Sequence, residues 1–154
     1  MELENELGGG RKLWPGGSAV RELAEKLARY AGMPATPVPG GIRASLRPYQ
    51  VEGLSWLRFL GESGLSGILA DDMGLGKTVQ TLALLLHRAE AGPALVIAPT
   101  SVCGNWAAEA LRFAPSLRVQ VFGDGDRRSV IEQAGPGDVV IASYSLAQIE
   151  AEAL

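Results

Sequence analysis

The sequence has little cysteine, no excess of positive charge and no long hydrophobic run. Its 154 residues contain one cysteine, Cys103, so no disulfide can form within the chain, which fits a reducing compartment. No apolar run approaches the roughly 18 residues of a membrane-spanning helix. The acidic N-terminus also lacks the basic-then-apolar layout of a signal peptide. We therefore expect no membrane partner and a cytoplasmic location, or a nuclear one in a eukaryote.

The shortage of positive charge bears on binding to nucleic acid. The formal net charge is −3, with 14 lysines and arginines against 17 aspartates and glutamates. A protein that binds DNA through a broad electrostatic footprint is usually basic. Any contact with nucleic acid must therefore be local, built from N–H groups, hydroxyls and a few arginines.

What the chain does have is a glycine-rich loop between an apolar run and an apolar helix. Residues 67–78 read Gly-Ile-Leu-Ala-Asp-Asp-Met-Gly-Leu-Gly-Lys-Thr. Gly74 and Gly76 allow backbone conformations closed to other residues, so successive N–H groups can point at phosphate oxygens. Lys77 supplies a point charge for the β- and γ-phosphates, and the Thr78 hydroxyl is placed to ligate Mg²⁺. The helix predicted to follow directs its positive end at the same anion.

One residue of this loop departs from the general P-loop pattern. That pattern has a glycine five positions before Gly76, and this chain has Asp71 there. A glycine-rich loop can also be a plain turn, but the apolar run before it and the Lys-Thr-helix after it favour a phosphate site. We therefore expect a nucleoside triphosphate with Mg²⁺.

The chain divides near residue 45 into two parts of different character. Residues 1–17 are glycine-rich without periodicity and are predicted to be a flexible lead, followed by an accessory helix over 18–31 with one apolar stripe. Residues 32–45 are rich in proline and glycine, which is typical of a linker. Residues 46–154 form the second part, in which helices and strands alternate.

This alternation predicts an α/β domain with a parallel sheet covered by helices. Short apolar runs predict strands buried on both sides at 67–70, 94–98 and 139–142, and an alternating run predicts an edge strand over 117–121. The predicted helices cover 48–61, 77–91, 101–113, 127–134 and 146–154. Ligands of such sheets bind at the carboxyl ends of the strands, where the glycine-rich loop falls.

Four segments occur in a fixed order along this second part. They read Leu-Arg-Pro-Tyr-Gln at 46–50, Asp-Asp-Met-Gly-Leu-Gly-Lys-Thr at 71–78, Leu-Val-Ile-Ala-Pro-Thr-Ser at 95–101 and Val-Val-Ile-Ala-Ser-Tyr-Ser at 139–145. Together they resemble the Swi/Snf-type family of helicase-like ATPases, superfamily 2 motors that translocate on double-stranded DNA. The resemblance covers residues 44–150 and makes the aspartate at the start of the loop a family feature.

The resemblance implies a fold, a cofactor and partners. The fold it implies is the front part of the first RecA-like lobe, a P-loop NTPase lobe that is incomplete here. The nucleotide is ATP with Mg²⁺. The partners are double-stranded DNA, contacted through its phosphates without sequence specificity, and a second motor lobe downstream.

The resemblance also assigns roles to individual residues. Gln50 matches a glutamine that reads the adenine edge, a role that suits an amide because it both donates and accepts hydrogen bonds. The alternative interpretation of Gln50 is an exposed polar residue at a helix start. The nucleotide site it implies is Gln50, Asp71, Asp72, Met73, Gly74, Leu75, Gly76, Lys77 and Thr78, with Thr78 on the metal. The DNA contacts it implies are Pro99, Thr100, Ser101, Asn105, Trp106, Ser143 and Tyr144. Thr100 or Ser101 can instead cap the next helix, and Trp106 can belong to the core.

Hydrolysis in this family needs an acidic pair, with one acid on Mg²⁺ and one orienting water, and an arginine from a second lobe. The sequence has no Asp-Glu dipeptide, so we identify no catalytic residue. An arginine finger alone is worth about 10³–10⁵ in rate. We therefore expect the ATP-binding segment of a translocase acting in chromatin remodelling, transcription or repair, which is not a competent ATPase by itself.

Two other functions remain open from the sequence. One is a stand-alone nucleotide-binding module without motor activity. The other is a P-loop NTPase or kinase acting on a small molecule, although such an enzyme has no need for the segments at 46–50 and 99–106.

Overall fold

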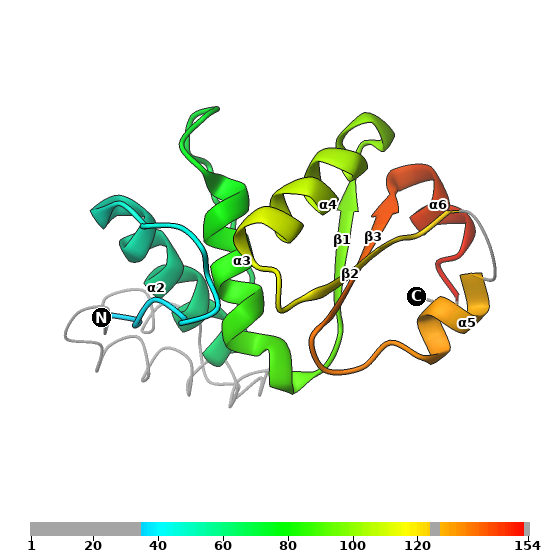
Figure 1. Ribbon diagram of the computed structural model, residues 1–154, viewed down its shortest axis with the longest axis horizontal. Coiled ribbons are helices and arrows are strands. Elements are labelled where there is room, and N and C mark those ends of the chain that lie inside the picture. Colours follow the sequence, from blue (N-terminus) through cyan, green and yellow to red (C-terminus); the bar gives the residue numbers. More distant parts are fainter. Residues whose placement is uncertain (1–34, 124–126, 153–154) are drawn as a thin grey trace, which may run out of the picture. The chain divides into compact units, whose positions relative to one another are not determined.

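The computed structural model describes residues 35–123 and 127–152, in which helices and strands alternate (Figure 1). The helices are α2 (Pro48–Glu62), α3 (Lys77–Arg88), the 3-10 helix η1 (Ala89–Ala91), α4 (Thr100–Phe113), α5 (Arg127–Glu132) and α6 (Tyr144–Ile149). The strands are β1 (Ala94–Ala98), β2 (Arg118–Val121) and β3 (Asp138–Ser143). None of the helices within these ranges is long and apolar enough to cross a membrane. The predicted lead at 1–17 and accessory helix at 18–31 lie outside the described residues.

The three strands form one parallel sheet in the order β1-β3-β2, which confirms the predicted α/β class. The central strand β3 is buried almost throughout, as expected for a strand covered on both faces. Helices α3 and α4 pack on one face of the sheet, and α5 and α6 pack on the other. The prediction that 117–121 forms an edge strand is also confirmed, because β2 is the last strand in the order.

The prediction that β1 is buried on both sides is wrong. Leu95 and Ile97 are 43% and 44% exposed. They pair in register with Val140 and Ala142, so they lie on the face covered by α5 and α6. These two helices are only six residues long and leave the outer strand half open on that face.

The predicted strand at 67–70 is also wrong, because this segment belongs to no strand. Gly67 and Leu69 lie along α2 instead of in the sheet, whereas Ile68 is 84% exposed. A methyl group added at Gly67 would meet the side chains of Trp56 and Leu60, and Leu69 lies beside Gly53. Four apolar residues carry too short a pattern to distinguish a strand from another packed segment, so the neighbouring helix decided the outcome.

The predicted helix ends differ from the structure at α5 and α6. Helix α5 ends at Glu132, two residues before the predicted end. Helix α6 begins at Tyr144, because the Ser143 hydroxyl accepts the N–H of Leu146 and caps it, and it ends at Ile149. Helix ends depend on such caps and on tertiary contacts, which hydrophobic periodicity does not contain.

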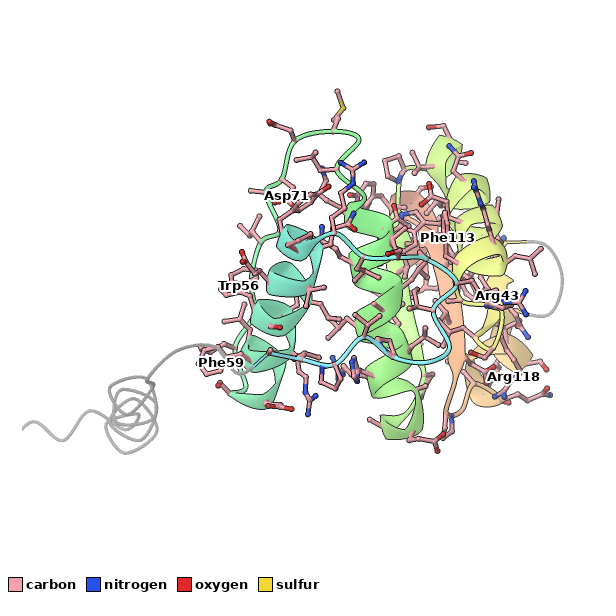
Figure 2. The ribbon with its side chains drawn as sticks, turned by 60° about the vertical axis from the view of Figure 1, so that its left-hand side comes forward. Arg43, Trp56, Phe59, Asp71, Phe113 and Arg118 are labelled. Carbon is pink, nitrogen blue, oxygen red and sulfur yellow. The ribbon has the colours of Figure 1, made fainter. Side chains whose placement is uncertain are left out.

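The described part of the predicted linker, residues 35–45, has no regular structure but is packed against three helices (Figure 2). The N–H of Thr36 donates to the Ser55 hydroxyl of α2 at 2.9 Å. The Pro37 carbonyl lies 2.6 Å from Nε2 of His87 on α3, and the Arg43 N–H donates to the Phe113 carbonyl of α4 at 2.7 Å. These bonds hold residues 35–45 against α2, α3 and α4, and we call this segment the proline-rich strap.

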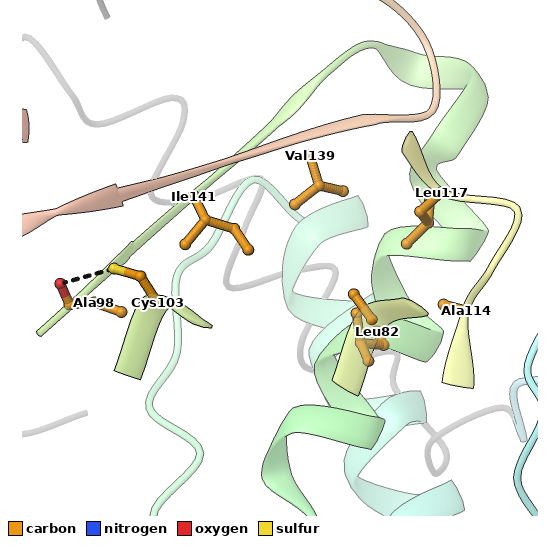
Figure 3. Close-up of a cluster of buried hydrophobic side chains, with 8 residues drawn as sticks. Leu82, Ala98, Cys103, Ala114, Leu117, Val139 and Ile141 are labelled. Atoms are coloured by element: carbon orange, nitrogen blue, oxygen red, sulfur yellow. Dashed lines mark hydrogen bonds between the residues drawn. The ribbon is translucent and has the colours of Figure 1, made fainter. Parts of the chain in front are cut away.

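The main core lies between the sheet and helices α3 and α4, as Figure 3 shows. Leu82 of α3 and Ile141 of β3 are fully buried in it. The Cys103 thiol of α4 lies 3.9 Å from the Ala98 carbonyl at the end of β1. This packing fixes the start of α4 against the carboxyl ends of the strands.

Candidate nucleotide and DNA site

The glycine-rich loop joins the segment along α2 to the first residue of α3. Gly74 and Gly76 have φ angles of +84° and +77°, in the left-handed region that glycine adopts without strain. Gly76 is the N-cap of α3, so the helix begins at Lys77 as predicted. Figure 1 shows the loop at the same end of the domain as the carboxyl ends of β1 and β3. Two positive φ angles next to a helix N-terminus are features that phosphate-binding loops share, and phosphate binding by this loop stays a prediction.

The Lys77 ammonium lies over the start of the loop. Its Nζ donates to the carbonyl of Asp71 at 2.6 Å and to the carbonyl of Asp72 at 2.9 Å. Both carbonyls are weak partners compared with a phosphate, which would accept the same ammonium with a full negative charge. The positive charge thus lies within the loop, beside the N-terminus of α3.

Gln50 holds the far end of the loop. Its Nε2 donates to the Leu75 carbonyl at 3.0 Å, and its Oε1 accepts the Arg47 N–H at 2.8 Å. The Tyr49 hydroxyl donates to the same Leu75 carbonyl at 3.2 Å. Gln50 is only 9% exposed, so the alternative of an exposed polar residue at a helix start is wrong. Its role toward adenine stays a prediction.

The tip of the loop is open to solvent. Asp72, Met73, Gly74 and Leu75 are exposed, and Met73 is 95% exposed. Thr78 lies half-buried in the first turn of α3. The described ranges contain no group of three or more metal-binding side chains that could hold an ion by themselves. The two positive φ angles, the lysine and the helix N-terminus fit a triphosphate. Metal binding by Thr78 stays a prediction.

The structure brings together the two segments predicted to contact DNA. Ala98 pairs in register with Ser143, so Pro99–Ser101 and Tyr144 lie at adjacent strand ends. Pro99, Thr100, Ser101 and Asn105 are exposed, and Tyr144 is 63% exposed. The N-cap of α4 is Pro99 and no side chain caps this helix, so the capping alternative for Thr100 or Ser101 is wrong. DNA contact by these residues stays a prediction.

Two of the residues predicted to contact DNA have structural roles. Trp106 is half-buried and packs against the main core, which is the alternative that the sequence left open. Ser143 is 6% exposed, and its hydroxyl accepts the Leu146 N–H at 3.3 Å and lies 3.1 Å from the Ser145 hydroxyl. We therefore expect weaker DNA contact from Trp106 and Ser143 than from the exposed residues beside them.

Among residues 35–123 and 127–152, an ion pair that shifts the pKa of both its partners lies at the amino ends of β2 and β3, away from the loop. Arg118 Nε donates to the Asp138 carboxylate at 2.7 Å, and the Gly135 N–H donates to the same carboxylate at 2.8 Å. The hydrogen bond from Arg118 lowers the pKa of Asp138 below its ordinary value, and the same bond raises the pKa of Arg118. This pair joins β2 to β3 and is a structural contact.

The sequence interpretation missed Gln80, which lies directly beneath the loop. Gln80 is fully buried, and its Nε2 donates to Asp71 Oδ2 at 3.0 Å. A signal was available in the sequence, because Gln80 shares one helix face with Ala83, and a polar residue in an apolar stripe needs a partner.

Comparisons with known proteins identify the family of this chain. The family model of the SNF2-related domain matches residues 49–154. The protein YwqA of Bacillus subtilis is 44% identical over 143 residues, which are 88% of this chain and 15% of YwqA. The ISWI chromatin-remodeling complex ATPase CHR11 of Arabidopsis thaliana is 46% identical over 125 residues, 75% of this chain and 12% of that protein.

A solved structure shows the same fold. It is the Sulfolobus solfataricus SWI2/SNF2 ATPase core in complex with dsDNA, with a TM-score of 0.66 and 41% identity. The match covers 73% of this chain and 24% of that one, so the chain spans only a part of the proteins it resembles. The chain belongs to the family of SNF2-related domains, and its fold is that of the RecA-like SWI2/SNF2 ATPase core.

Proposed function

We propose that this chain is the ATP-binding segment of an ATP-dependent translocase of double-stranded DNA. The observation that carries the proposal is the loop at 71–78, which combines two glycines of positive φ, an inward-facing lysine and the N-terminus of α3. The names of relatives support it, because CHR11 is a chromatin-remodeling ATPase and the Sulfolobus core was solved with dsDNA. This family favours a translocase over a kinase acting on a small molecule.

Each residue of the nucleotide site would have a distinct task. Lys77 would exchange the carbonyls of Asp71 and Asp72 for phosphate oxygens, and Thr78 would ligate Mg²⁺. Backbone N–H groups of the loop would donate to the phosphates, and the Leu75 N–H would first have to leave the Asp72 carbonyl, to which it donates at 3.4 Å. Gln50 would face the adenine while it keeps the Leu75 carbonyl in place. Bound ATP supplies the free energy that hydrolysis releases for movement along DNA.

The DNA surface would lie at the carboxyl ends of β1 and β3. Thr100, Ser101, Asn105 and Tyr144 present hydroxyl and amide groups there, and such groups contact phosphates without reading sequence. A local surface of this kind agrees with the net charge of −3, which is unfavourable for a broad basic footprint. The setting would be the compartment that holds the DNA, which is the cytoplasm in a bacterium and the nucleus in a eukaryote.

Hydrolysis would require residues that the 154-residue chain does not contain. The sequence has no Asp-Glu pair to bind Mg²⁺ and orient water, and a second lobe would have to supply the arginine. Loss of an arginine finger alone costs about 4–7 kcal/mol of barrier. We expect the isolated chain to bind nucleotide with negligible turnover.

The test is titration of the chain with a fluorescent ATP analogue and Mg²⁺, compared with Lys77→Ala. Loss of a charged hydrogen bond, worth about 1.5–3 kcal/mol, should weaken binding about 10- to 100-fold. Arg88→Ala is the matched control, because it removes a positive charge from the exposed C-terminal end of the same helix. Equal affinity of the wild type and Lys77→Ala would remove Lys77 from the site.

A second measurement tests the statement about hydrolysis. ATP turnover of the chain is measured with and without duplex DNA. We expect no turnover above background in either case. Robust DNA-stimulated turnover would show that the chain already holds a complete catalytic site.

A further inference from the structure

Gln80 is an amide buried completely within an apolar helix face. Its side chain is 0% exposed and lies on the buried side of α3 with Leu82 and Ala83. Its Nε2 donates to Asp71 Oδ2 at 3.0 Å, while its Oε1 has no hydrogen-bond partner among the described residues. A buried amide with an unpaired carbonyl costs free energy that leucine or methionine would avoid. The bond to Asp71 is the compensating contact that an apolar residue could not make.

Gln80 acts together with Lys77 on the residue that opens the loop. The two side chains are three positions apart on α3, so they lie on the same face one turn apart. Lys77 Nζ donates to the Asp71 carbonyl, and Gln80 Nε2 donates to the Asp71 carboxylate. Figure 2 shows Asp71 beside the ends of α2 and α3 where the loop begins. Helix α3 therefore holds both the backbone and the side chain of Asp71.

Gly53 of α2 leaves the space that Gln80 occupies. A methyl group added at Gly53 would collide with Gln80 Oε1. Glycine inside a helix is less stable than alanine, so helix stability does not explain this residue. Close approach of the Gln80 side chain does explain it.

We propose that Gln80 is a positioning residue of the nucleotide site, which holds Asp71 so that the loop keeps its phosphate-binding form. Gly53 contributes to this positioning because its missing side chain leaves space for the Gln80 amide. The hydrogen bond from Gln80 accounts for Asp71 at the position where the general P-loop pattern has glycine, because it connects the aspartate side chain to the helix that follows the loop. The inference rests on the proposed function, because the loop it positions is the proposed ATP site.

The experiment compares the wild type with Gln80→Met, Gly53→Ala and Asp71→Asn. Amide hydrogen exchange across 70–78 without nucleotide measures the order of the loop directly, and titration with the fluorescent ATP analogue measures the consequence. We expect Gln80→Met and Gly53→Ala to speed exchange in the loop and to weaken nucleotide binding about tenfold, as for loss of one hydrogen bond to a carboxylate. Asp71→Asn keeps an acceptor oxygen but removes its charge, so both measurements should lie between those of the wild type and of Gln80→Met.

Two controls separate positioning from general stability. Leu82→Val trims a fully buried core residue of the same helix, and it should lower the melting temperature while loop exchange and affinity stay unchanged. Gln80→Met is also made in an Asp71→Ala background, where the partner is already lost. There we expect no further loss of affinity, because the two substitutions break the same bond.

The outcomes decide the inference and the proposed function separately. An equal effect of Gln80→Met in both backgrounds, or unchanged loop exchange in Gly53→Ala, would overturn the positioning role. If Gln80→Met does not fold, Gly53→Ala decides by the same two measurements. Absence of nucleotide binding by the wild type would overturn the proposed function, while the exchange rates would still decide whether Gln80 positions the loop.

Discussion

The two glycines of the loop both have a positive φ angle but lie in different surroundings, and this difference gives a specific prediction. Gly74 and Gly76 have φ angles of +84° and +77°. A methyl group at Gly74 would meet nothing within 4 Å, whereas one at Gly76 would lie 2.5 Å from Nε2 of Gln50. Gly74→Ala therefore introduces backbone strain alone, while Gly76→Ala introduces strain and also displaces the Gln50 amide.

The expected losses of stability follow from these contacts. Left-handed backbone costs a non-glycine residue about 1–2 kcal/mol, of which about 0.4–1 kcal/mol is offset by the smaller entropy of the unfolded chain. Gly74→Ala should therefore lower the free energy of unfolding by about 1 kcal/mol. Displaced Gln50 loses its bonds to Leu75 and Arg47, at about 1 kcal/mol each, so Gly76→Ala should lower it by about 3 kcal/mol.

Equilibrium unfolding in urea measures both values, since the variants should leave the dependence on urea concentration unchanged. The same pair is then measured in a Gln50→Ala background. There the gap of about 2 kcal/mol between the two glycine variants should close, because the displaced amide is already gone. Equal losses for both variants in the wild-type background would refute the role of Gln50 as a brace of the loop.

Three further predictions concern the core, a cap and an ion pair. Leu82→Ala should lower the free energy of unfolding by about 2–5 kcal/mol, because Leu82 is fully buried. Its control is Leu111→Ala, which should lower it by less than about 0.5 kcal/mol because Leu111 is 74% exposed. Similar losses for the two variants in urea unfolding would contradict the position of Leu82 in the core. Ser143→Ala should cost about 1 kcal/mol by removing the cap of α6, whereas Thr100→Ala, at an uncapped helix start, should cost little in the same assay. Asp138→Asn should lower the melting temperature at neutral pH. Because folding lowers the pKa of Asp138, the stabilisation by its carboxylate is present above the ordinary value of 3.8 and disappears as the pH falls below it. A difference in melting temperature between wild type and variant that persists at low pH would argue against the ion pair.

Features that depend on local chemistry could be predicted from the sequence. Lys77 begins α3 because the preceding glycine adopts a left-handed conformation that ends the loop. The bounds of β1 agree with the predicted run at 94–98, since proline and glycine precede it and Pro99 follows it. Both signals reside in neighbouring residues, so no knowledge of distant contacts was needed.

Features that depend on packing between distant segments could not be predicted. The apolar run at 67–70 packs along α2 through Gly67 and Leu69 instead of joining the sheet. The proline-rich strap is held by bonds to α2, α3 and α4, although its composition is typical of a loose linker. In both cases the partner surface lies far away in the sequence, and composition carries no information about it.

The sequence by itself determined the family, the α/β class and the loop that would hold a triphosphate, because these rest on residue types at fixed spacing. Only the tertiary structure decided how the loop is held. Gln50 of α2 donates a hydrogen bond to the Leu75 carbonyl. Gln80, on the buried face of α3, donates one to the Asp71 carboxylate, and Gly53 leaves the space for its side chain. These contacts exist only once α2 lies against α3, and a buried amide finds its partner through that packing.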